Sequence, residues 1–329
     1  MTEASVVICA YTLDRWDQLR DAVASVRCQT RPPREIFVVV DGNEKLRQRA
    51  AAEINGATVV ANAKTPGLSG GRMTGAELAT APVIAFLDDD AIADPNWLEE
   101  LLEAYRDPRV LGAGGEIEPL WSREPPAWFP SEFNWVIGCT YAGMPVRNGQ
   151  VRNFIGANMS VRADVLHRAG GFTTKLGRRE GGVVVRGVAE SCEETEFCIR
   201  AARLQPGGVW AYRPKARVRH FVPAQRMTWR YFVRRCRMEG TAKAVLTGLA
   251  GSRDGLGSER RYVLTLLRAV LRDTVSSLTG ERGAARRAAA MAAGLGITAW
   301  AYASMRARLA LTIRSAAAAS APVRSGTVP

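Results

Sequence analysis

Histidine and paired cysteines are scarce in this chain of 329 residues. It has two histidines, His167 and His220, and its six cysteines are scattered, with no C-x-x-C pair and no Cys/His cluster at zinc-binding spacing. This pattern excludes a zinc finger and a C-x-x-C redox motif. No apolar run as long as a secretory signal opens the chain, because Val6–Ala10 is too short and polar residues follow it. We therefore expect reduced thiols and a cytoplasmic protein.

Acidic residues are scarce as well, but only in the last third of the chain. Residues 1–225 hold 27 Lys and Arg against 27 Asp and Glu, whereas residues 226–329 hold 18 against 5, so the whole net charge of +13 lies in this third. With 47% hydrophobic residues, the chain can bury a sizeable core in one large domain with an appendage, or in two domains. A basic appendage beside a neutral domain indicates binding to an anionic surface, either a membrane or a nucleic acid.

Short apolar runs alternate with helical patterns in the first part of the chain. The expected strands are Ser5–Ala10, Glu35–Val40, Thr58–Ala61 and Pro82–Leu87, and the expected helices are Trp16–Gln29, Glu44–Ile54 and Arg72–Thr80. Runs that are apolar throughout are typical of parallel strands buried on both faces. We predict an α/β fold with a doubly wound, mostly parallel, Rossmann-like sheet, whose ligands bind beyond the carboxyl ends of the strands. Asp41 and the triplet Asp88–Asp90 lie at such ends.

This regular alternation stops after Pro95. Residues 115–150 are rich in Pro and Trp and are predicted to have little regular structure. Their aromatic side chains form either an acceptor platform or a satellite core beneath a long loop: Trp121, Trp128, Phe129 and Trp135. Further on, a Gly/Arg-rich loop over Leu176–Val188 precedes Glu190–Phe197, in which four of eight residues are acidic. This acidic stretch is predicted to begin a helix that runs to Ala202.

The aspartate triplet is the first candidate site. Three carboxylates at the end of a buried strand repel one another and lose hydration unless a cation neutralises them. Hard oxygen ligands completed by phosphate oxygens are typical of Mg²⁺ or Mn²⁺ bound to a nucleoside diphosphate. A solvated turn is the alternative, and it is weakened because Asp41 ends an earlier strand in the same way. We therefore predict a metal and nucleotide site at this edge of the sheet.

Several short motifs follow one another in an order that resembles a known family. They are Val6–Tyr11, Glu35–Gly42, Gly70–Arg72 and Ile84–Asp90, followed by Gly156–Asn158, Gly170–Phe172 and Glu193–Arg200. Together they resemble the family 2 glycosyltransferases with a GT-A fold over residues 4–225. The resemblance places a nucleotide-sugar half in residues 1–95 and an acceptor half in residues 96–225. His220, with Arg234-Arg235 and Glu239-Gly240 after it, resembles an actinobacterial-type branch of that family.

The resemblance implies roles for residues of the donor half. Asp41 would hydrogen-bond the base, usually uracil, while Ala10 and Tyr11 would line the base and the ribose. Arg72 would lie near the diphosphate, where a guanidinium can pair with phosphate oxygens. From the residues alone, a turn at the end of a strand explains Asp41 equally well. For Arg72 the alternative is a solvated residue at a helix start. The family commonly has Asn after this Arg, and Met73 stands there instead.

The resemblance also divides the aspartate triplet. Asp88 would reach the ribose and Asp90 would bind the metal, while Asp89 assists or faces away. His220 aligns with a histidine that completes the metal shell in some relatives, and a packed histidine is the alternative. His167 lies in a predicted helix without acidic neighbours in sequence.

Transfer of a sugar with inversion is a displacement that needs a base for the acceptor hydroxyl and a Lewis acid for the departing diphosphate. The base is expected at a helix start, where the peptide dipole favours an ionised carboxylate. The family places the second acid of a Glu-Asp pair there, and this chain has Glu193-Glu194. We predict Glu194 as the base and Glu193 as its neighbour in the acceptor site. Glu196 and Arg200 are predicted to form a structural i,i+4 pair.

The last third is helical by pattern. An apolar stripe with a helical period comprises Val263, Leu266, Leu267, Val270, Leu271, Val275 and Leu278, and arginines lie off it. Such helices suit the surface of an anionic bilayer, and packing on the preceding domain or binding to nucleic acid are the alternatives. Ala288–Met305 has no charge but is too weakly apolar to be predicted as a membrane span. We divide this third into a basic helical region, residues 226–314, and a tail predicted to be disordered, residues 315–329.

These observations predict an inverting glycosyltransferase that uses Mg²⁺ or Mn²⁺ and a nucleotide-diphosphate sugar, expected to be UDP-linked. Its acceptor is a small molecule, a glycan or a lipid-linked hydroxyl, and neither the acceptor nor the donor sugar can be read from these residues. We expect a cytoplasmic protein in peripheral contact with the inner face of the cell membrane. A nucleotidyltransferase of similar fold is one alternative, disfavoured because Ala10–Asp14 is not a Gly-rich basic loop. A non-enzymatic nucleic-acid-binding protein is the other, disfavoured because the basic helices lack interleaved aromatic residues, so we expect no nucleic-acid partner.

Overall fold

The predicted alternation of strands and helices is present from the first strand onward. The computed structural model describes residues 2–172, 192–250 and 259–319. Its first elements are β1 (Ala4–Ala10), α1 (Trp16–Arg27), β2 (Glu35–Val40), α2 (Glu44–Glu53), β3 (Thr58–Ala61), α3 (Leu68–Leu78) and β4 (Val83–Asp88). Strand β1 pairs in parallel with β2 and β4, and β2 pairs in parallel with β3. The resulting order β3-β2-β1-β4 is that of a doubly wound sheet, as predicted.

The sheet continues beyond β4 with the strands that follow it in the chain. These are β5 (Ala91–Ala93), β6 (Val110–Trp121), β7 (Gly149–Val151), β8 (Asn158–Arg162) and β9 (Val209–Val222). Strand β8 runs antiparallel between β4 and β6, and β9 lies parallel to β6. The full order is β3-β2-β1-β4-β8-β6-β9-β5, with β7 paired to β9. The antiparallel strand β8 thus joins the parallel strands β1–β4 to β6 and β9 in one sheet.

The prediction of little regular structure from residue 115 was wrong for strand β6, which runs to Trp121. Glycines interrupt the apolar pattern of this strand and hide it in the sequence. Close packing against the neighbouring strand requires at least one of them. A Cβ on Gly115 would lie 1.9 Å from the carbonyl oxygen of Ala216 in the neighbouring strand β9. The strand expected over Ala216–Arg219 is likewise only the middle of β9.

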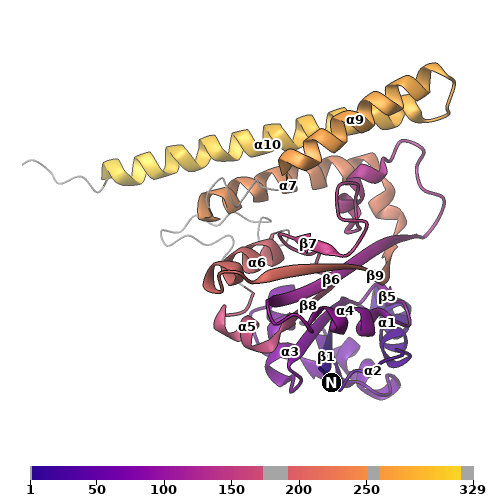
Figure 1. Ribbon diagram of the computed structural model, residues 1–329, viewed down its shortest axis with the longest axis vertical. Helices are drawn as coiled ribbons and strands as arrows, with labels where there is room; N and C mark the ends of the chain where they lie inside the picture. The colour runs from indigo at the N-terminus through magenta and orange to yellow at the C-terminus, as the bar shows by residue number, and fades with distance from the viewer. Residues whose placement is uncertain (1, 173–191, 251–258, 320–329) are drawn as a thin grey trace, which may run out of the picture.

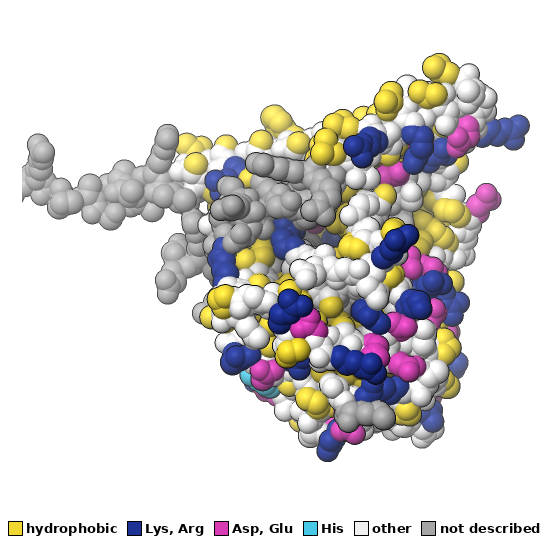
Figure 2. Space-filling model, viewed as in Figure 1, with side chains coloured by type: hydrophobic (Ala, Val, Ile, Leu, Met, Phe, Trp, Pro, Cys, Tyr) yellow, Lys and Arg dark blue, Asp and Glu magenta, His cyan; other side chains and the backbone are white. Residues whose placement is uncertain are grey.

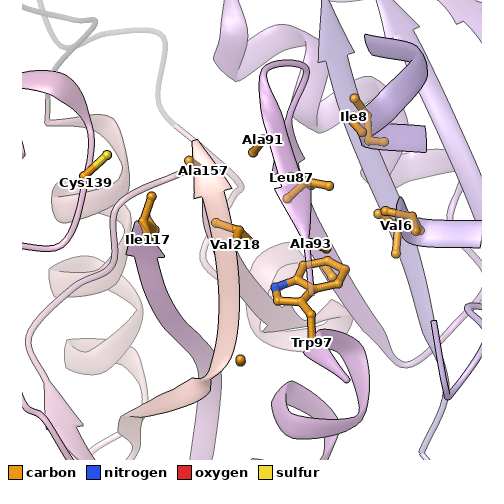
Figure 3. Packing of buried hydrophobic residues seen from close by; sticks show 14 of the residues in the cluster. Val6, Ile8, Leu87, Ala91, Ala93, Trp97, Ile117, Cys139, Ala157 and Val218 are labelled. Carbon is orange, nitrogen blue, oxygen red and sulfur yellow. The ribbon is translucent and has the colours of Figure 1, made fainter. Parts of the chain in front are cut away.

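Helices cover both faces of the sheet, so its strands are buried on both sides. One core contains Val6 and Ile8 of β1 with side chains from α1, α2 and α4 (Trp97–Ala104). The other contains Val7 of β1 with side chains from α3, α5 (Ala163–Arg168) and α6 (Glu193–Leu204). Figure 3 shows Leu87 and Val218 in the first core around the fully buried indole of Trp97. This alternation of faces explains why β1 is apolar at almost every position, with Ser5 as its one polar residue.

Three long helices form a layer over the sheet domain, at the top of Figure 1: α7 (Trp229–Ala250), α9 (Glu259–Leu278) and α10 (Ala284–Ala319). An aromatic cluster joins this layer to the segment around the 3₁₀ helix Ser131–Ile137. Phe232 of α7 lies 5.1 Å from Phe133 and 5.6 Å from Trp128, measured between ring centroids. Trp128 and Phe129 therefore belong to a satellite core, as one of the two alternatives predicted. These contacts pack α7 directly against the sheet domain. The assignment of residues 226–314 to a separate region stays a prediction.

Helix α10 packs along α7 and α9. A Cβ on Gly240 of α7 would lie 2.2 Å from the carbonyl oxygen of Thr298, so the two helix backbones approach closely. Over Ala284–Thr312, α10 is long and apolar enough to cross a membrane by length and composition, with a mean hydropathy of 1.2. The helix extends to Ala319 and thus includes residues 315–319, which were predicted to be disordered, while residues 320–329 lie outside the described part.

Candidate active site

A cleft of about 1710 Å³ lies between the carboxyl ends of the parallel strands and the helical layer. All ten residues predicted from the sequence line it: Ala10, Tyr11, Asp41, Arg72, Asp88, Asp89, Asp90, Glu193, Glu194 and His220. They meet because the ends of β1, β2 and β4 share one edge of the sheet, and the start of α6 and the end of β9 approach the same edge.

Asp88, Asp90 and His220 form a cluster whose ligand atoms lie within 4.8 Å of one another. Strand pairing produces it, because His220 of β9 stands opposite Ala91 of β5, directly after the triplet. Two carboxylates and one imidazole, Asp90 and His220 both being buried, are a donor set that could hold Mg²⁺ or Mn²⁺ with phosphate oxygens completing the shell. His220 is therefore placed as the sequence predicted, beside Asp90 and not in an unrelated part of the core.

The ion pair between Asp90 and His220 controls the protonation of both groups. The imidazole Nε2 lies 3.1 Å from Oδ1 of Asp90. Burial opposes charge on both side chains, yet their mutual attraction outweighs it. The pKa of Asp90 is lowered to about 2, and the pKa of His220 is raised to about 10. In the absence of a metal ion, an imidazolium thus neutralises Asp90.

Arg15 completes the surroundings of the triplet, and the sequence analysis missed it. Its Nη1 lies 2.8 Å from Oδ1 of Asp89 and 3.1 Å from Oδ2 of Asp90. Burial and the neighbouring Asp90 carboxylate raise the pKa of Asp89 to about 7, and Arg15 opposes this rise. Asp89 thus pairs with Arg15, and its role as an assisting or outward-facing residue stays a prediction. Arg15 follows shortly after the end of β1, at the sheet edge that also carries the triplet. This position was the signal that could have identified it.

Arg72 links the two halves of the cleft. Its guanidinium lies 2.7 Å from Oε1 of Glu194, 3.3 Å from Oε1 of Glu193 and 3.5 Å from Oδ1 of Asp88. The alternative of a solvated residue at a helix start is wrong, because α3 begins at Leu68 and the Arg72 side chain is 2% exposed. Burial opposes its charge, but the three carboxylates raise the pKa of Arg72 above its ordinary value. Its Nη2 is buried and has no hydrogen-bond partner in the described residues, only the longer ion-pair contact to Asp88.

The two adjacent glutamates have different surroundings. Glu193 is buried and accepts a hydrogen bond from the hydroxyl of Ser69, a second residue that the sequence analysis missed. Burial and the Glu194 carboxylate raise the pKa of Glu193 to about 7, against the effect of Arg72. Glu194 lies in the first turn of α6, is partly exposed to the cleft and accepts a hydrogen bond from Arg72. Of the two, Glu194 is the carboxylate more exposed to the cleft.

Gly156 makes room for this pair. A Cβ at this position would lie 2.1 Å from Oε1 of Glu194 and 2.2 Å from Nη2 of Arg72. The neighbouring Asn158 is structural instead, since its side chain bonds the backbone of Glu116 and Ala216. The glycine of the Gly156–Asn158 motif is thus the member that shapes the cleft.

The donor edge of the cleft is formed by Asp41 and Tyr11. The Asp41 carboxylate accepts hydrogen bonds from Nδ2 of Asn62, at 2.7 Å, and from the backbone N–H of Gly67, at 2.8 Å. It thereby fixes the loop that leads into α3. Tyr11 is 56% exposed at the rim, and the guanidinium of Arg15 lies 5.5 Å from its ring centroid. Both side chains border the cleft where the resemblance expects a base and a ribose.

Other predicted residues have structural surroundings. Met73, at the position where Asn was expected, packs into the second core, and a Cβ on Gly171 would lie 2.5 Å from its sulfur atom. Glu196 and Arg200 form the predicted pair on α6 at 2.8 Å. Glu190 and the loop over residues 176–188 lie outside the described residues.

Comparisons with known proteins agree with this geometry. The family model for glycosyl transferase family 2 matches residues 5–170. A glucosyl-dolichyl phosphate glucuronosyltransferase of Haloferax volcanii is 35% identical over 248 residues, which are 74% of this chain and 77% of that protein.

Two solved structures share the fold. The mannosyltransferase PcManGT from Pyrobaculum calidifontis, in complex with GDP-Man and Mn²⁺, matches with a TM-score of 0.54 and 16% identity over 90% of this chain and 87% of that one. GalNAc-T7 with UDP, GalNAc and Mn²⁺ matches with a TM-score of 0.51 and 19% identity over 72% of this chain but only 47% of that one. These likenesses confirm the predicted fold with its C-terminal helices, whereas placement in an actinobacterial-type branch stays a prediction. The chain belongs to glycosyl transferase family 2 and is a glycosyltransferase.

Proposed function

We propose that this enzyme transfers a sugar from a nucleotide-diphosphate donor to a hydroxyl of a lipid-linked acceptor, with inversion at the anomeric carbon and Glu194 as the base. The observation that carries the proposal is the position of Glu194. It lies at the start of α6, hydrogen-bonded to Arg72, in the same cleft as Asp88, Asp90 and His220. A base on one side of a sugar and a charge-stabilising group on the other are the two requirements of a single displacement.

Glu194 is suited to take the proton of the acceptor hydroxyl. Its place in the first turn of α6 and its hydrogen bond from Arg72 hold its carboxylate at the wall of the cleft. Glu193, whose pKa is raised to about 7, carries a proton more readily than an ordinary glutamate and so limits the negative charge beside Glu194. The proton moves from the attacking hydroxyl to a carboxylate oxygen of Glu194 as the oxygen approaches the anomeric carbon.

The donor is held at the opposite side of the cleft. We assign the metal to Asp88, Asp90 and His220, supported by the Mn²⁺ in the two solved structures of this fold. When bound, Mg²⁺ or Mn²⁺ supplies Lewis-acid stabilisation of the departing diphosphate. Arg72 lines the cleft beside Asp88, and Asp41, Ala10 and Tyr11 line the space proposed for the base and the ribose. We propose a UDP-linked donor, following the resemblance, although the two solved structures carry UDP and GDP-Man respectively.

The helical layer supports an acceptor at a membrane. Helix α9 buries Leu266 but exposes a second apolar stripe to solvent, in which Leu271 is 65% and Leu278 84% exposed: Leu264, Leu267, Leu271, Val275 and Leu278. Figure 2 shows hydrophobic side chains along the outer edge of this layer and Lys and Arg side chains beneath them. This arrangement fits a helix that rests on an anionic bilayer surface. A relative named for a dolichyl phosphate-linked acceptor points in the same direction. We therefore propose peripheral binding at the cytoplasmic face of a membrane.

Donor turnover tests the proposal most directly. Nucleotide release from a panel of UDP- and GDP-sugars is measured with Mn²⁺ or Mg²⁺ and with EDTA. We expect metal-dependent release with one donor, and at least a hundredfold lower transfer in Glu194→Gln. Glu196→Gln is the matched control on the same helix, because Glu196 pairs only with Arg200 in the described residues. Full activity of Glu194→Gln, or turnover in EDTA, would overturn the mechanism.

A further inference from the structure

One face of helix α7 borders the cleft outside the donor site. Four of its cleft-lining residues are spaced four positions apart, with Gly240 beside them: Tyr231, Arg235, Glu239 and Lys243. Residues four apart lie above one another on an α-helix, so these four form one continuous strip. Lys243 and Glu239 pair with each other at 3.5 Å. Arg235 is the other cation of this strip, and no residue in the described part of the chain forms an ion pair with it.

The guanidinium of Arg235 is incompletely satisfied. Its Nε is buried and has no hydrogen-bond partner in the described part of the chain. Leaving a buried N–H without a partner is unfavourable, and more so when the group is charged. Because the Arg235 side chain lines the cleft, an anionic ligand there would supply the partner that its guanidinium lacks.

The donor diphosphate already has other candidate partners. Arg226 lies 3.8 Å from Oδ2 of Asp90, and Arg15 and Arg72 contact the aspartate triplet directly. Arg235 comes nine residues after Arg226 and lies on the second turn of α7, whose first residue is Trp229. No ion pair joins Arg235 to the aspartates among the described residues. A second anion, separate from the diphosphate, accounts better for this arginine.

The wall that the appended helices contribute to the cleft is mainly apolar and aromatic. Helix α9 supplies Tyr262, Val263 and Leu266, and α10 supplies Leu295 and Tyr302. A ligand with an anionic head and a long apolar chain fits this part of the cleft. Its anion would meet Arg235, and its chain would lie against the apolar wall. Helix α9 also exposes an apolar stripe on its outer side. A membrane in contact with this stripe would bring the apolar chain of a lipid close to the cleft.

We propose that Arg235 binds the phosphate of a lipid-phosphate acceptor, whose apolar chain runs along the wall formed by α9 and α10. This inference rests on the proposed function and specifies its acceptor: the phosphate binds α7, while the hydroxyl to be glycosylated points to Glu194. Arg235 is a binding residue and takes no part in the proton transfer.

Binding of farnesyl phosphate to the full-length chain tests the inference by calorimetry, with farnesol and inorganic phosphate as separate arms. We expect farnesyl phosphate to bind wild type at least tenfold more tightly than either arm, since only this probe has both parts. Arg235→Gln should weaken its binding at least tenfold and leave the affinity for Mn²⁺–UDP unchanged. Arg237→Gln is the matched control, because Arg237 is exposed on the same helix. Arg235→Lys, which keeps the charge, should bind with intermediate affinity and covers the case in which Arg235→Gln does not fold.

Three outcomes would overturn the inference. They are no binding of farnesyl phosphate to wild type, equal binding by wild type and Arg235→Gln, or a parallel loss of Mn²⁺–UDP affinity in Arg235→Gln. Tight binding of inorganic phosphate at Arg235 would also overturn it, because the lipid chain would then contribute nothing. Failure of wild type to bind Mn²⁺–UDP or to release nucleotide would instead count against the proposed function, so the two failures are distinguishable.

Discussion

Substitution of Arg72 by Met removes the cation on which three carboxylates of the cleft depend. The guanidinium contacts Glu194, Glu193 and Asp88 at 2.7, 3.3 and 3.5 Å, and its side chain is 2% exposed. Removing one partner of a buried ion pair costs about 3–5 kcal/mol, because the remaining charge stays buried and unpaired. Water reaches Glu194 and Asp88 in part, so we expect the lower end of this range, about 3 kcal/mol, in Arg72→Met.

The loss should depend on pH with a definite sign. Burial already raises the pKa of Glu193 to about 7 and raises that of Asp88, while Arg72 opposes both rises. Without Arg72 these carboxylates resist ionisation further. A raised pKa in the folded state contributes stability at low pH that is lost as the pH rises through the folded pKa. The destabilisation should therefore be larger at pH 8 than at pH 5.5.

Urea unfolding followed by circular dichroism measures this difference at the two pH values. Arg20→Met is the control, because Arg20 is an exposed arginine 3.8 Å from Asp17 on the surface, and its loss should have little effect. The reasoning fails if Arg72→Met is within about 1 kcal/mol of wild type at pH 8. It also fails if the variant loses more stability at pH 5.5 than at pH 8.

Three further predictions follow from single contacts. Glu193→Gln should remove the cost of ionising a buried carboxylate whose pKa is raised to about 7. Between pH 5 and pH 8 the free energy of unfolding of the wild type should fall by up to about 3 kcal/mol relative to this variant. Unfolding across a pH series measures this difference, and parallel stability curves would contradict the raised pKa. Gly156→Ala should lower sugar transfer at least tenfold, because its Cβ meets the Glu194–Arg72 pair; unchanged kcat would show that the cleft tolerates the methyl group. Leu271→Gln should reduce flotation with anionic liposomes, whereas Leu204→Gln, equally exposed but on α6, should not; equal flotation of both variants would exclude α9 as the membrane-binding face.

Much of the donor half could be predicted because its information is local. The strands from Ser5 to Leu87 are apolar at successive positions, and each is followed by a turn or a helix. Asp41 and Asp88–Asp90 follow strands directly, so parallel pairing brings them to one edge whatever the rest of the chain does. The start of α6 was also marked locally, by acids that favour a helix N-terminus.

The ion pairs of the site were not predictable in the same way. Arg15 meets Asp89 across 74 positions of sequence, and Arg72 meets Glu194 across 122. No local pattern distinguishes such an arginine from a solvated one, because both kinds carry the same side chain on similar helices. The burial of Arg72 depends on Gly156 and on α6 closing over it, and both are distant in the chain.

Helix α9 shows the division most clearly. The sequence by itself determined that this segment is a helix with apolar and arginine-rich faces, since a period of 3.6 residues is a property of neighbouring residues. It predicted one stripe, however, and the tertiary structure divides that stripe: Leu266 is fully buried in the layer, while Leu267 and Leu271 are exposed. Which side of an apolar helix is covered depends on the helices that pack against it. Only the folded chain therefore decided which leucines line the cleft side and which remain for a membrane.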